Sequence, residues 1–341
     1  MTINKAVICA VVPAYKVTRH IVGVVRGLFE QVDHVFVVDD ACPDHSGEFL
    51  LNALGGTDPR LTVIRLSQNQ GVGGAVMAGY SAAAERGYDV LVKVDGDGQM
   101  EPSLIPYLVA PVLVGEADYT KGNRFFDPES LTEMPLLRIV GNAGLSFLCK
   151  LSTGYWHVMD PTNGFTALHA RVLPWLHMDK IERRYFFETD MLYRLGIVNA
   201  VVADVPMSAR YGDEQSHLRA GTALFEFAYK HLTRLSKRIF YIYFLRGFSL
   251  GSVFLVASLP LMLGGSIFGL VEWYHSVQTG QVASAGTIML AAMPTLVGIQ
   301  LFLSFLALDM SSPSVKPLWQ RVACRPCDGP VNAPRSSLGS K

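Results

Sequence analysis

The chain has 341 residues, of which half are apolar and only 17% are charged, and its formal net charge is zero. This length is enough for about two domains, and a neutral chain gives no basis for nucleic-acid binding, which depends on a basic surface. Charged residues are frequent up to about Arg246 and absent from 247–271. The composition therefore predicts a charged N-terminal domain followed by an apolar segment.

The first part of the chain alternates short apolar runs, typical of buried strands, with segments of helical character. Strands that alternate with helices through short connections predict a largely parallel sheet with helices on both faces. The predicted strand and helix pairs are 6–12 with 17–30, 34–38 with 46–54, 61–66 with 73–86, and 89–94 with 102–113.

Residues suited to nucleotide binding follow all four predicted strands. Carboxylates there can accept hydrogen bonds from a base or a ribose, a tyrosine ring can cover a base, and glycine allows the backbone to approach a ligand closely. Ligands of α/β sheets bind at the carboxyl ends of the strands, so these residues are expected to form one site. They are Pro13, Tyr15, Asp39, Asp40, Asn69, Gly71, Asp95 and Asp97.

The most informative of these sets is Asp95-Gly-Asp97-Gly-Gln99, which follows the apolar run 89–94. Two carboxylates two residues apart at a strand end can bind one hard cation together with a diphosphate. The same residues are also ordinary turn formers, because glycine supplies positive φ and aspartate caps its own backbone. The order of the elements around the motif favours the metal site.

Two uncharged runs, 247–271 and 286–308, are each about as long as a helix that spans a hydrocarbon core of roughly 30 Å. The alternative is a pair of buried core helices, which are rarely free of charge over such a length. Lys and Arg are absent from the connection 272–285 and frequent on the other side of both runs. The positive-inside rule therefore predicts a membrane hairpin with the N-terminal domain and both termini in the cytoplasm.

Residues 218–246 carry apolar side chains near helical spacing with basic side chains between them. This pattern predicts an amphipathic juxtamembrane helix that lies in the lipid headgroup layer. The last segment is rich in Pro and Ser and is expected to be a flexible tail. The predicted units are therefore 1–217, 218–246, 247–310 and 311–341.

Five motifs in this order resemble the family 2 glycosyltransferases, whose GT-A fold is a Rossmann-like α/β domain with a mainly parallel sheet. They are Val-Pro-Ala-Tyr at 12–15, Val-Val-Asp-Asp-Ala-Cys-Pro-Asp at 37–44, Asn-Gln-Gly-Val-Gly at 69–73, Asp-Gly-Asp-Gly-Gln at 95–99 and Gly-Asn-Arg at 122–124. With the two C-terminal spans, the chain is similar to the polyprenyl-phosphate hexose synthases, such as dolichyl-phosphate mannose synthase and undecaprenyl-phosphate glucosyltransferases. The resemblance implies inverting transfer of a hexose from UDP- or GDP-hexose to a polyprenyl phosphate at the cytoplasmic membrane.

The resemblance also implies roles for the polar residues at the strand ends. In that family the Asp-x-Asp-x-Gln motif holds Mg²⁺ or Mn²⁺ on the sugar-nucleotide diphosphate, which assigns the metal to Asp95, Asp97 and Gln99. The metal would offset the charge that builds on the leaving nucleoside diphosphate. The nucleotide sugar itself would be bound by Pro13, Tyr15, Asp39, Asp40, Asn69, Gly71 and Asp95.

A polyprenyl phosphate acceptor is already an anion near neutral pH, so it needs arginines beside the donor more than it needs a strong base. By resemblance, Arg124 and Arg138 would grip the acceptor phosphate, with Asn142 as a further donor. Arg210 would reach the donor phosphates from a mobile loop. Asp190 lies where many relatives keep a carboxylate base and is a further catalytic candidate. The alternatives are a surface charge or an ion pair for the arginines and a helix N-terminal carboxylate for Asp190.

Two other functions fit part of this pattern. One is a membrane glycosyltransferase that acts on a hydroxyl acceptor in polysaccharide or glycolipid synthesis, and the other is a catalytically silent scaffold that binds nucleotide sugars. A processive polysaccharide synthase is disfavoured, because the chain has no Gln-x-x-Arg-Trp motif and two spans are few for a polymer channel. Gly251, Gly264 and Gly265 can pack helix on helix either within the hairpin or in a homo-oligomer.

Overall fold

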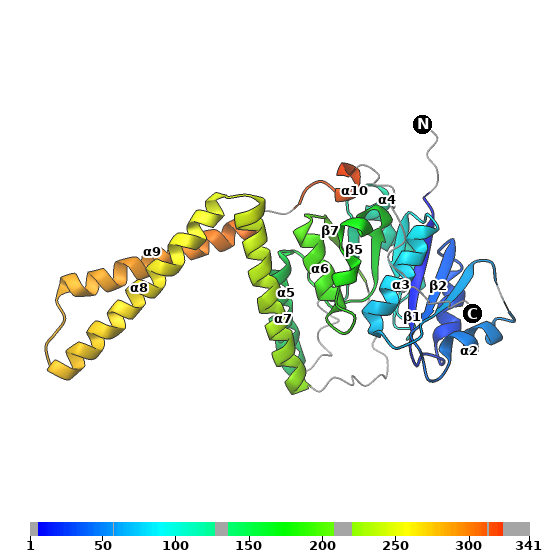
Figure 1. Ribbon diagram of the computed structural model, residues 1–341, viewed down its shortest axis with the longest axis horizontal. Coiled ribbons are helices and arrows are strands. Elements are labelled where there is room, and N and C mark those ends of the chain that lie inside the picture. The colour runs from blue at the N-terminus through cyan, green and yellow to red at the C-terminus, as the bar shows by residue number, and fades with distance from the viewer. Residues whose placement is uncertain (1–5, 57, 127–135, 208–219, 312–313, 323–341) are drawn as a thin grey trace, which may run out of the picture.

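A computed structural model of the chain describes residues 6–56, 58–126, 136–207, 220–311 and 314–322, with the backbone alone for 136–140, 142 and 220–225. An α/β domain built on one seven-stranded sheet precedes a long helical hairpin that extends away from it (Figure 1). The order of the strands in the sheet is β3-β2-β1-β4-β6-β5-β7. Their bounds are β1 Ile8–Ala14, β2 His34–Asp39, β3 Leu61–Arg65, β4 Val90–Lys93, β5 Tyr119–Asn123, β6 Thr166–His169 and β7 Val202–Pro206.

The first half of the sheet is the parallel α/β arrangement that the sequence predicts. Strands β3, β2, β1 and β4 are neighbours and run parallel, whereas β6 runs antiparallel to both β4 and β5. The intervening helices are α1 Ile21–Leu28, α2 Ser46–Ala53, α3 Gly71–Glu85 and α4 Ile105–Leu113, the last preceded by the 3₁₀ turn η1 Pro102–Leu104. Helix α1 starts four residues later than predicted, because the chain first makes a turn in which the His20 N–H donates to the Val17 carbonyl.

Two hydrophobic cores lie on opposite faces of the sheet, because successive side chains of a strand point to opposite sides. From β1, Cys9 and Val11 pack in the core beneath α3, and Ala10 and Val12 pack in the core beneath α1, α2 and α4. The first core is also covered by elements of the second half of the domain. They are α5 Leu136–Thr153, α6 Phe187–Ile197, and the 3₁₀ turns η3 Ala170–Trp175 and η4 Met178–Lys180.

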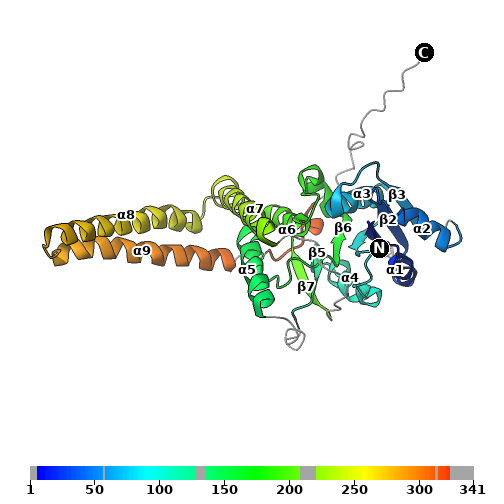
Figure 2. The same cartoon turned by 90° about the horizontal axis from the view of Figure 1, so that it is seen from below.

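The C-terminal hairpin consists of α8 (Leu250–Thr279) and α9 (Ala285–Met310), with mean hydropathies of 2.0 and 1.9 over their most apolar stretches. Only 17% and 11% of the residues in those stretches are buried, which excludes the alternative of two core helices. Both helices are long and apolar enough to cross a membrane. Helix α8 continues eight residues past the predicted span, so the predicted connection 272–285 was too long (Figure 2).

Small residues let the two hairpin helices approach each other closely. A side chain at Gly265 would meet the Thr295 hydroxyl at 2.5 Å, and one at Gly298 would meet the Met262 backbone nitrogen at 2.6 Å. Of the glycines predicted to pack, Gly265 therefore serves the contact within the hairpin. Gly251 instead lies against the Tyr243 ring, where an added Cβ would be 2.8 Å from the nearest ring atom.

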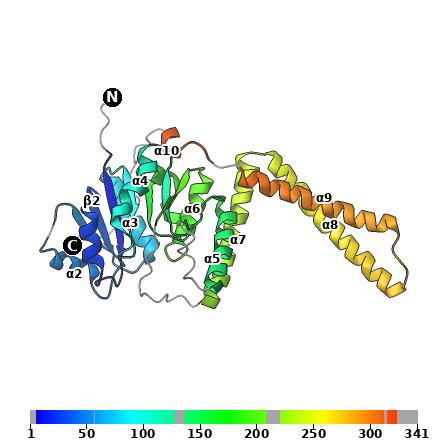
Figure 3. The ribbon, with the colours of Figure 1, turned by 180° about the vertical axis from the view of Figure 1, so that it is seen from behind.

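The predicted amphipathic segment forms α7 (Ala220–Phe240) followed by a π-helical turn, η5 (Tyr241–Arg246). Three of its basic side chains, Lys230, Arg234 and Arg238, contact carboxylates of the same chain, whereas Lys237 is exposed. Helices α7 and α5 lie side by side between the domain and the hairpin (Figure 3). Large apolar side chains are exposed on α7 and η5, among them Tyr229, Leu232, Phe240, Tyr241 and Leu245.

A buried cluster joins the end of α9 to the rest of the molecule. Both guanidinium Nη atoms of Arg238 contact the Asp309 carboxylate, at 2.8 and 2.9 Å. The same carboxylate accepts hydrogen bonds from the Tyr243 hydroxyl at 2.8 Å and the Trp156 indole at 3.0 Å. We call Asp309, Arg238, Tyr243 and Trp156 the junction cluster, because it connects α9, α7, η5 and the segment after α5.

After the hairpin the chain returns to the α/β domain. The Asp118 carboxylate accepts the backbone N–H groups of Leu318 and Trp319 at 2.7 and 2.8 Å. These are the first two residues of the short helix α10 (Leu318–Arg321). The Trp319 ring stacks on His169 with ring centroids 4.3 Å apart. The prediction of a flexible tail from residue 311 is therefore wrong for 314–322, because a buried carboxylate and an imidazole ring fix this segment.

Candidate active site

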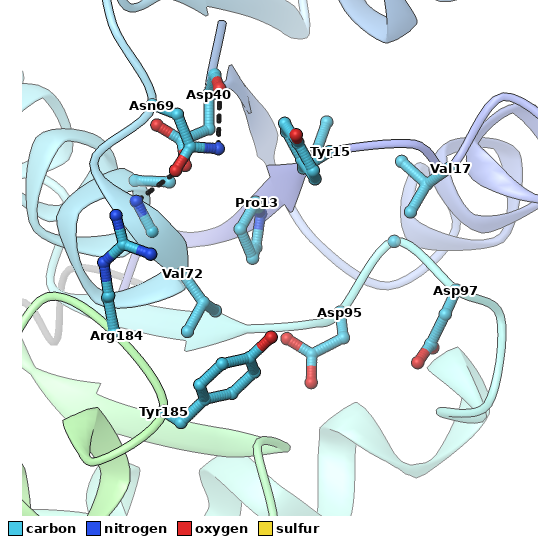
Figure 4. A pocket seen from close by; sticks show the side chains of 14 residues that line it. Pro13, Tyr15, Val17, Asp40, Asn69, Val72, Asp95, Asp97, Arg184 and Tyr185 are labelled. Atoms are coloured by element: carbon cyan, nitrogen blue, oxygen red, sulfur yellow. Dashed lines mark hydrogen bonds between the residues drawn. The ribbon is translucent and has the colours of Figure 1, made fainter. Parts of the chain in front are cut away.

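A cavity of about 530 Å³ opens at the carboxyl ends of β1 and β4 and at the start of α3 (Figure 4). It is the edge of the sheet at which the sequence predicts a ligand site. Seven of the predicted residues lie together in its wall. They are Pro13, Tyr15, Asp40, Asn69, Gly71, Asp95 and Asp97.

Asp40 organises the wall of the cavity next to α3. Its two carboxylate oxygens accept the backbone N–H groups of Gln70 at 2.6 Å and Gly71 at 2.8 Å, and its carbonyl accepts a hydrogen bond from Asn69 (Figure 4). Gly71 has a φ of +81°, and a Cβ there would lie 2.5 Å from the Arg183 carbonyl oxygen. Glycine is needed at this position because no side chain fits both the conformation and the space.

Asp39, the neighbour of Asp40, is not part of the cavity wall. Its carboxylate accepts the backbone N–H groups of Cys42 and Gly47, each at 2.8 Å, and the residue is 5% exposed. Successive side chains at the end of β2 point to opposite sides, so one aspartate reaches the cavity and the other holds the following loop.

Asp95 and Asp97 present two carboxylates to the cavity from the loop after β4 (Figure 4). Asp97 also accepts the Gln99 backbone N–H at 3.0 Å, whereas Gln99 itself does not line the cavity. In the described part of the chain, no group of three or more His, Cys, Asp or Glu side chains is placed to hold a metal ion. Two hard oxygen donors beside an open cavity suit a divalent cation whose remaining ligands are diphosphate oxygens and water.

Arg124 lies at the end of β5 and outside the cavity wall. Its Nε and Nη2 atoms contact the Asp160 carboxylate at 2.7 and 3.1 Å, and Asp160 is fully buried. This arginine is therefore ion-paired with a buried carboxylate, and 31% of its side chain remains exposed. Its role toward the acceptor phosphate stays a prediction. Arg138 and Asn142 belong to α5, but their side chains lie outside the described part of the structure, and so does all of Arg210.

Asp190, predicted as a catalytic candidate, lies in the first turn of α6. Its fully buried carboxylate contacts the Arg234 Nε of α7 at 2.6 Å and the Arg194 Nε at 3.5 Å, and it accepts the Glu182 N–H. With these partners it joins α6 to α7, which favours a structural role in this arrangement. A catalytic role for Asp190 stays a prediction.

Arg184 and Tyr185 also line the cavity and were not predicted from the sequence. Arg184 lies beside the Asp40 end of the cavity, and the Tyr185 hydroxyl points toward Asp95 (Figure 4). A cation and an exposed aromatic ring are suited to an anionic, ring-containing ligand. The signal in the sequence was the pair itself, placed directly before the Phe-Phe-Glu-Thr-Asp motif.

Two buried lysines of the sheet were also not predicted: Lys93 ends the apolar strand β4, and Lys121 lies in β5. Lys93 of β4 contacts Asp95 and Glu188. Burial disfavours its charge, but the two carboxylates outweigh that effect and raise the pKa of Lys93. Lys121 of β5 donates to the Asn163 carbonyl, and burial lowers the pKa of this lysine to about 8.

The seven-stranded sheet and the cavity at its edge define a GT-A-like glycosyltransferase domain. Residues 9–174 match the model of the family described as Glycosyl transferase family 2. The chain is 30% identical to the undecaprenyl-phosphate mannosyltransferase of Micrococcus luteus over 205 residues, which are 59% of this chain and 82% of that protein. The protein therefore belongs to glycosyltransferase family 2.

Two further relatives have similar names. The UDP-N-acetylglucosamine--dolichyl-phosphate N-acetylglucosaminyltransferase of Methanococcus voltae is 29% identical over 213 residues, 59% of this chain and 84% of the relative. The polyprenol monophosphomannose synthase of Mycolicibacterium smegmatis is 30% identical over 203 residues, 58% of this chain and 75% of the relative. These relatives are polyprenyl-phosphate sugar transferases by name, and the sugars in their names differ.

Proposed function

We propose that this protein transfers a hexose, with inversion, from a UDP- or GDP-hexose to a polyprenyl phosphate at a membrane surface. The observation that carries the proposal is the cavity in which Tyr15, Asp40, Asp95 and Asp97 meet at the carboxyl ends of the strands. The names of the relatives support the acceptor. The two apolar helices support a membrane setting.

On the donor side, the cavity offers a nucleoside end and a diphosphate end. Tyr15 is 44% exposed, so its ring is accessible to a base, while Asp40 keeps the backbone around Asn69 and Gly71 in place. Asp95 and Asp97 would hold Mg²⁺ or Mn²⁺ together with the diphosphate at the other end. Such an ion, when bound, neutralises the charge that develops on the leaving nucleoside diphosphate. Arg184 is suited to contact the same anion.

On the acceptor side, the structure favours a phosphate over a hydroxyl group. A hydroxyl acceptor needs a general base to remove its proton, whereas a phosphate monoester is already an anion. In the segment expected to supply such a base, Asp190 is bound by two arginines, and Glu188 is paired with Lys93. The candidates for holding the acceptor phosphate are Arg124, which follows β5, and Arg138 and Asn142 of α5. Arg210 is the candidate for the donor phosphates.

We place the α/β domain and the residues after the hairpin in the cytoplasm. The basic residues that flank both spans support this topology, since positive charge is retained on the cytoplasmic side. The contact of Asp118 with 318–319 also supports it, because the chain enters and leaves the hairpin on the same side. The exposed apolar side chains of α7 and η5 would lie at the lipid surface and keep the cavity near its lipid substrate.

The test is transfer of label from a panel of radioactive UDP- and GDP-hexoses to undecaprenyl phosphate, with Mn²⁺ or Mg²⁺ and the full-length protein in membranes. We expect metal-dependent label in the lipid phase with one donor, and its loss in Asp97→Ala. Asp58→Ala is a matched control, because Asp58 pairs with Arg60 on the surface away from the cavity. Tight nucleotide binding without lipid label from any donor would contradict a polyprenyl phosphate acceptor and leave the scaffold alternative.

A further inference from the structure

Lys93 is buried in the central strand of the sheet with three oxygen atoms around its ammonium group. The Nζ atom lies 2.7 Å from Asp95 Oδ1, 3.3 Å from Glu188 Oε1 and 3.2 Å from the Gly164 carbonyl oxygen. The lysine side chain is 1% exposed, whereas those of Asp95 and Glu188 are 29% and 15% exposed. The ammonium group thus forms the floor beneath a carboxylate that faces the cavity.

A charged group in the middle of a sheet is unfavourable unless it is paired, so this lysine needs a compensating arrangement. Lys121 provides a comparison within the same sheet, because both lysines pair with Thr166 of the intervening strand β6. Lys121 donates to the Asn163 backbone carbonyl instead. Of the two buried lysines, Lys93 is therefore the one that contacts a carboxylate of the cavity wall.

Gly164 shows how closely this arrangement is packed. A Cβ at this position would lie 2.4 Å from Lys93 Nζ and 2.4 Å from Asp95 Oδ2. Any side chain would therefore displace the lysine or the aspartate. The Asp95 carboxylate is held from two sides, by the ammonium group on one oxygen and by the Gly164 backbone against the other.

We propose that Lys93 is a positioning residue of the active site, which ties Asp95 to Glu188 and so holds Asp95 in the orientation in which it binds the divalent cation. Without the lysine, two carboxylates would share a largely buried space and repel each other, so that one of them would turn away. Glu188 is a second positioning residue in this arrangement. The proposal rests on the proposed function, since it concerns the metal of that site.

The test is Mn²⁺ binding to the full-length protein in detergent, followed by electron paramagnetic resonance of the free ion, with UDP and GDP in separate titrations. We expect Lys93→Met to weaken Mn²⁺ binding at least tenfold. The double variant Lys93→Met/Glu188→Gln should recover at least threefold of that loss, because it removes the uncompensated carboxylate. Lys121→Met is the control for loss of a buried lysine and should leave the Mn²⁺ affinity unchanged.

Gly164→Ala provides a second variant in case Lys93→Met does not fold, which thermal unfolding would show, and it should weaken Mn²⁺ binding about fivefold. Unchanged or tighter Mn²⁺ binding in folded Lys93→Met, or in Gly164→Ala, would overturn the role of Lys93. It would show that the lysine only fills space or opposes the cation. Wild-type protein that binds no Mn²⁺ with either nucleotide would instead overturn the proposed function, and this inference with it.

Discussion

The cavity and the membrane junction use the same residue type for opposite purposes. In the cavity, Asp95 and Asp97 face open space, and 29% of the Asp95 side chain is exposed. Where α7 contacts α6 and α9, Asp190 and Asp309 are enclosed by arginines of α7, and their side chains are 0% and 5% exposed. The difference lies in the partners. Arginines of α7 enclose Asp190 and Asp309, whereas Asp95 contacts the buried Lys93 and still presents an exposed face to the cavity.

The arginines of α7 connect the α/β domain to the hairpin. Helix α7 places Arg234 on Asp190 of the α/β domain and, four residues later, Arg238 on Asp309 of the hairpin. Residues four apart lie on the same face of a helix, so one face of α7 connects both units. Arg234 and Arg238 therefore serve the internal architecture, and the large apolar side chains of the helix are exposed.

Asp309→Ala should produce the largest effect, and the effect should be on stability. The substitution leaves the buried Arg238 guanidinium without its carboxylate, a change that typically costs about 3 kcal/mol or more. Thermal unfolding in detergent should show a markedly lower midpoint. A double variant, Arg238→Met/Asp309→Leu, should be less destabilised than the single one, and equal destabilisation of the two would contradict a buried charge pair at the junction.

Asp97→Asn should have its main effect on activity. We expect transfer to fall on the order of 100-fold, the typical result of removing one group that stabilises charge in a transition state. The thermal unfolding midpoint should stay within experimental error of the wild type, because Asp97 lines a cavity. A large loss of stability with normal activity per folded molecule would show that Asp97 has a structural role like those of Asp190 and Asp309.

Asp190→Asn tests whether the aspartates bound by α7 arginines differ in role from those of the cavity. The loss of one charge opposite Arg234 and Arg194 should lower the free energy of unfolding by about 2 kcal/mol. The Mn²⁺ and pH dependence of the folded protein's transfer activity should be unchanged. Should this variant remain as stable as the wild type and lose transfer, Asp190 would be a catalytic base after all.

Tyr15→Ala should weaken donor binding with little effect on the chemical step. Stacking of a base on an aromatic side chain contributes about 1–3 kcal/mol, so we expect the donor KM to rise about tenfold. Tyr15→Phe, which keeps the ring, is the matched control and should resemble the wild type. The steady-state kinetics of both variants would measure this, and an equal loss in the two would point to the hydroxyl group rather than the ring.

Acidification should weaken the contact between α7 and α5 through His231 of α7, whose Nδ1 atom is 2.8 Å from the Ser152 hydroxyl of α5. Burial lowers the pKa of His231 from 6.5 to about 4, so the unfolded chain binds a proton in this range and the folded protein does not. Stability is then lost as the pH falls from about 6.5 to 4. His231→Gln cannot take up that proton, and its unfolding midpoint should depend less steeply on pH in this window.

Local patterns were sufficient to predict the part of the fold that depends on neighbouring residues. The four strands before Asp95 and their helices follow from the alternation of apolar runs and helical segments, and the two spans follow from their length and lack of charge. The cavity follows from the rule that strand ends share an edge. What the sequence could not predict depends on distant partners. The Asp118 carboxylate binds amides 200 residues away, and Asp190 binds an arginine on α7, which no spacing reveals.

The second half of the sheet was also beyond local patterns. Strand β6 reverses direction between β4 and β5, and its loop contributes Gly164, which must be small because Lys93 and Asp95 meet there. A lysine in an apolar strand was visible in the sequence. Its pairing with Glu188 was not, since 95 residues separate the two along the chain.

The identity of the lipid product would show directly whether the protein transfers a sugar to a polyprenyl phosphate. Purified full-length protein in lipid nanodiscs would be incubated with undecaprenyl phosphate, Mn²⁺ and the donor found active, and the lipids analysed by mass spectrometry before and after mild acid. The account predicts undecaprenyl phosphate carrying one sugar residue, with an acid-labile linkage, in wild type and in Asp58→Ala but not in Asp97→Ala. An acid-stable glycolipid with the sugar on a hydroxyl group, or free sugar alone, would contradict it.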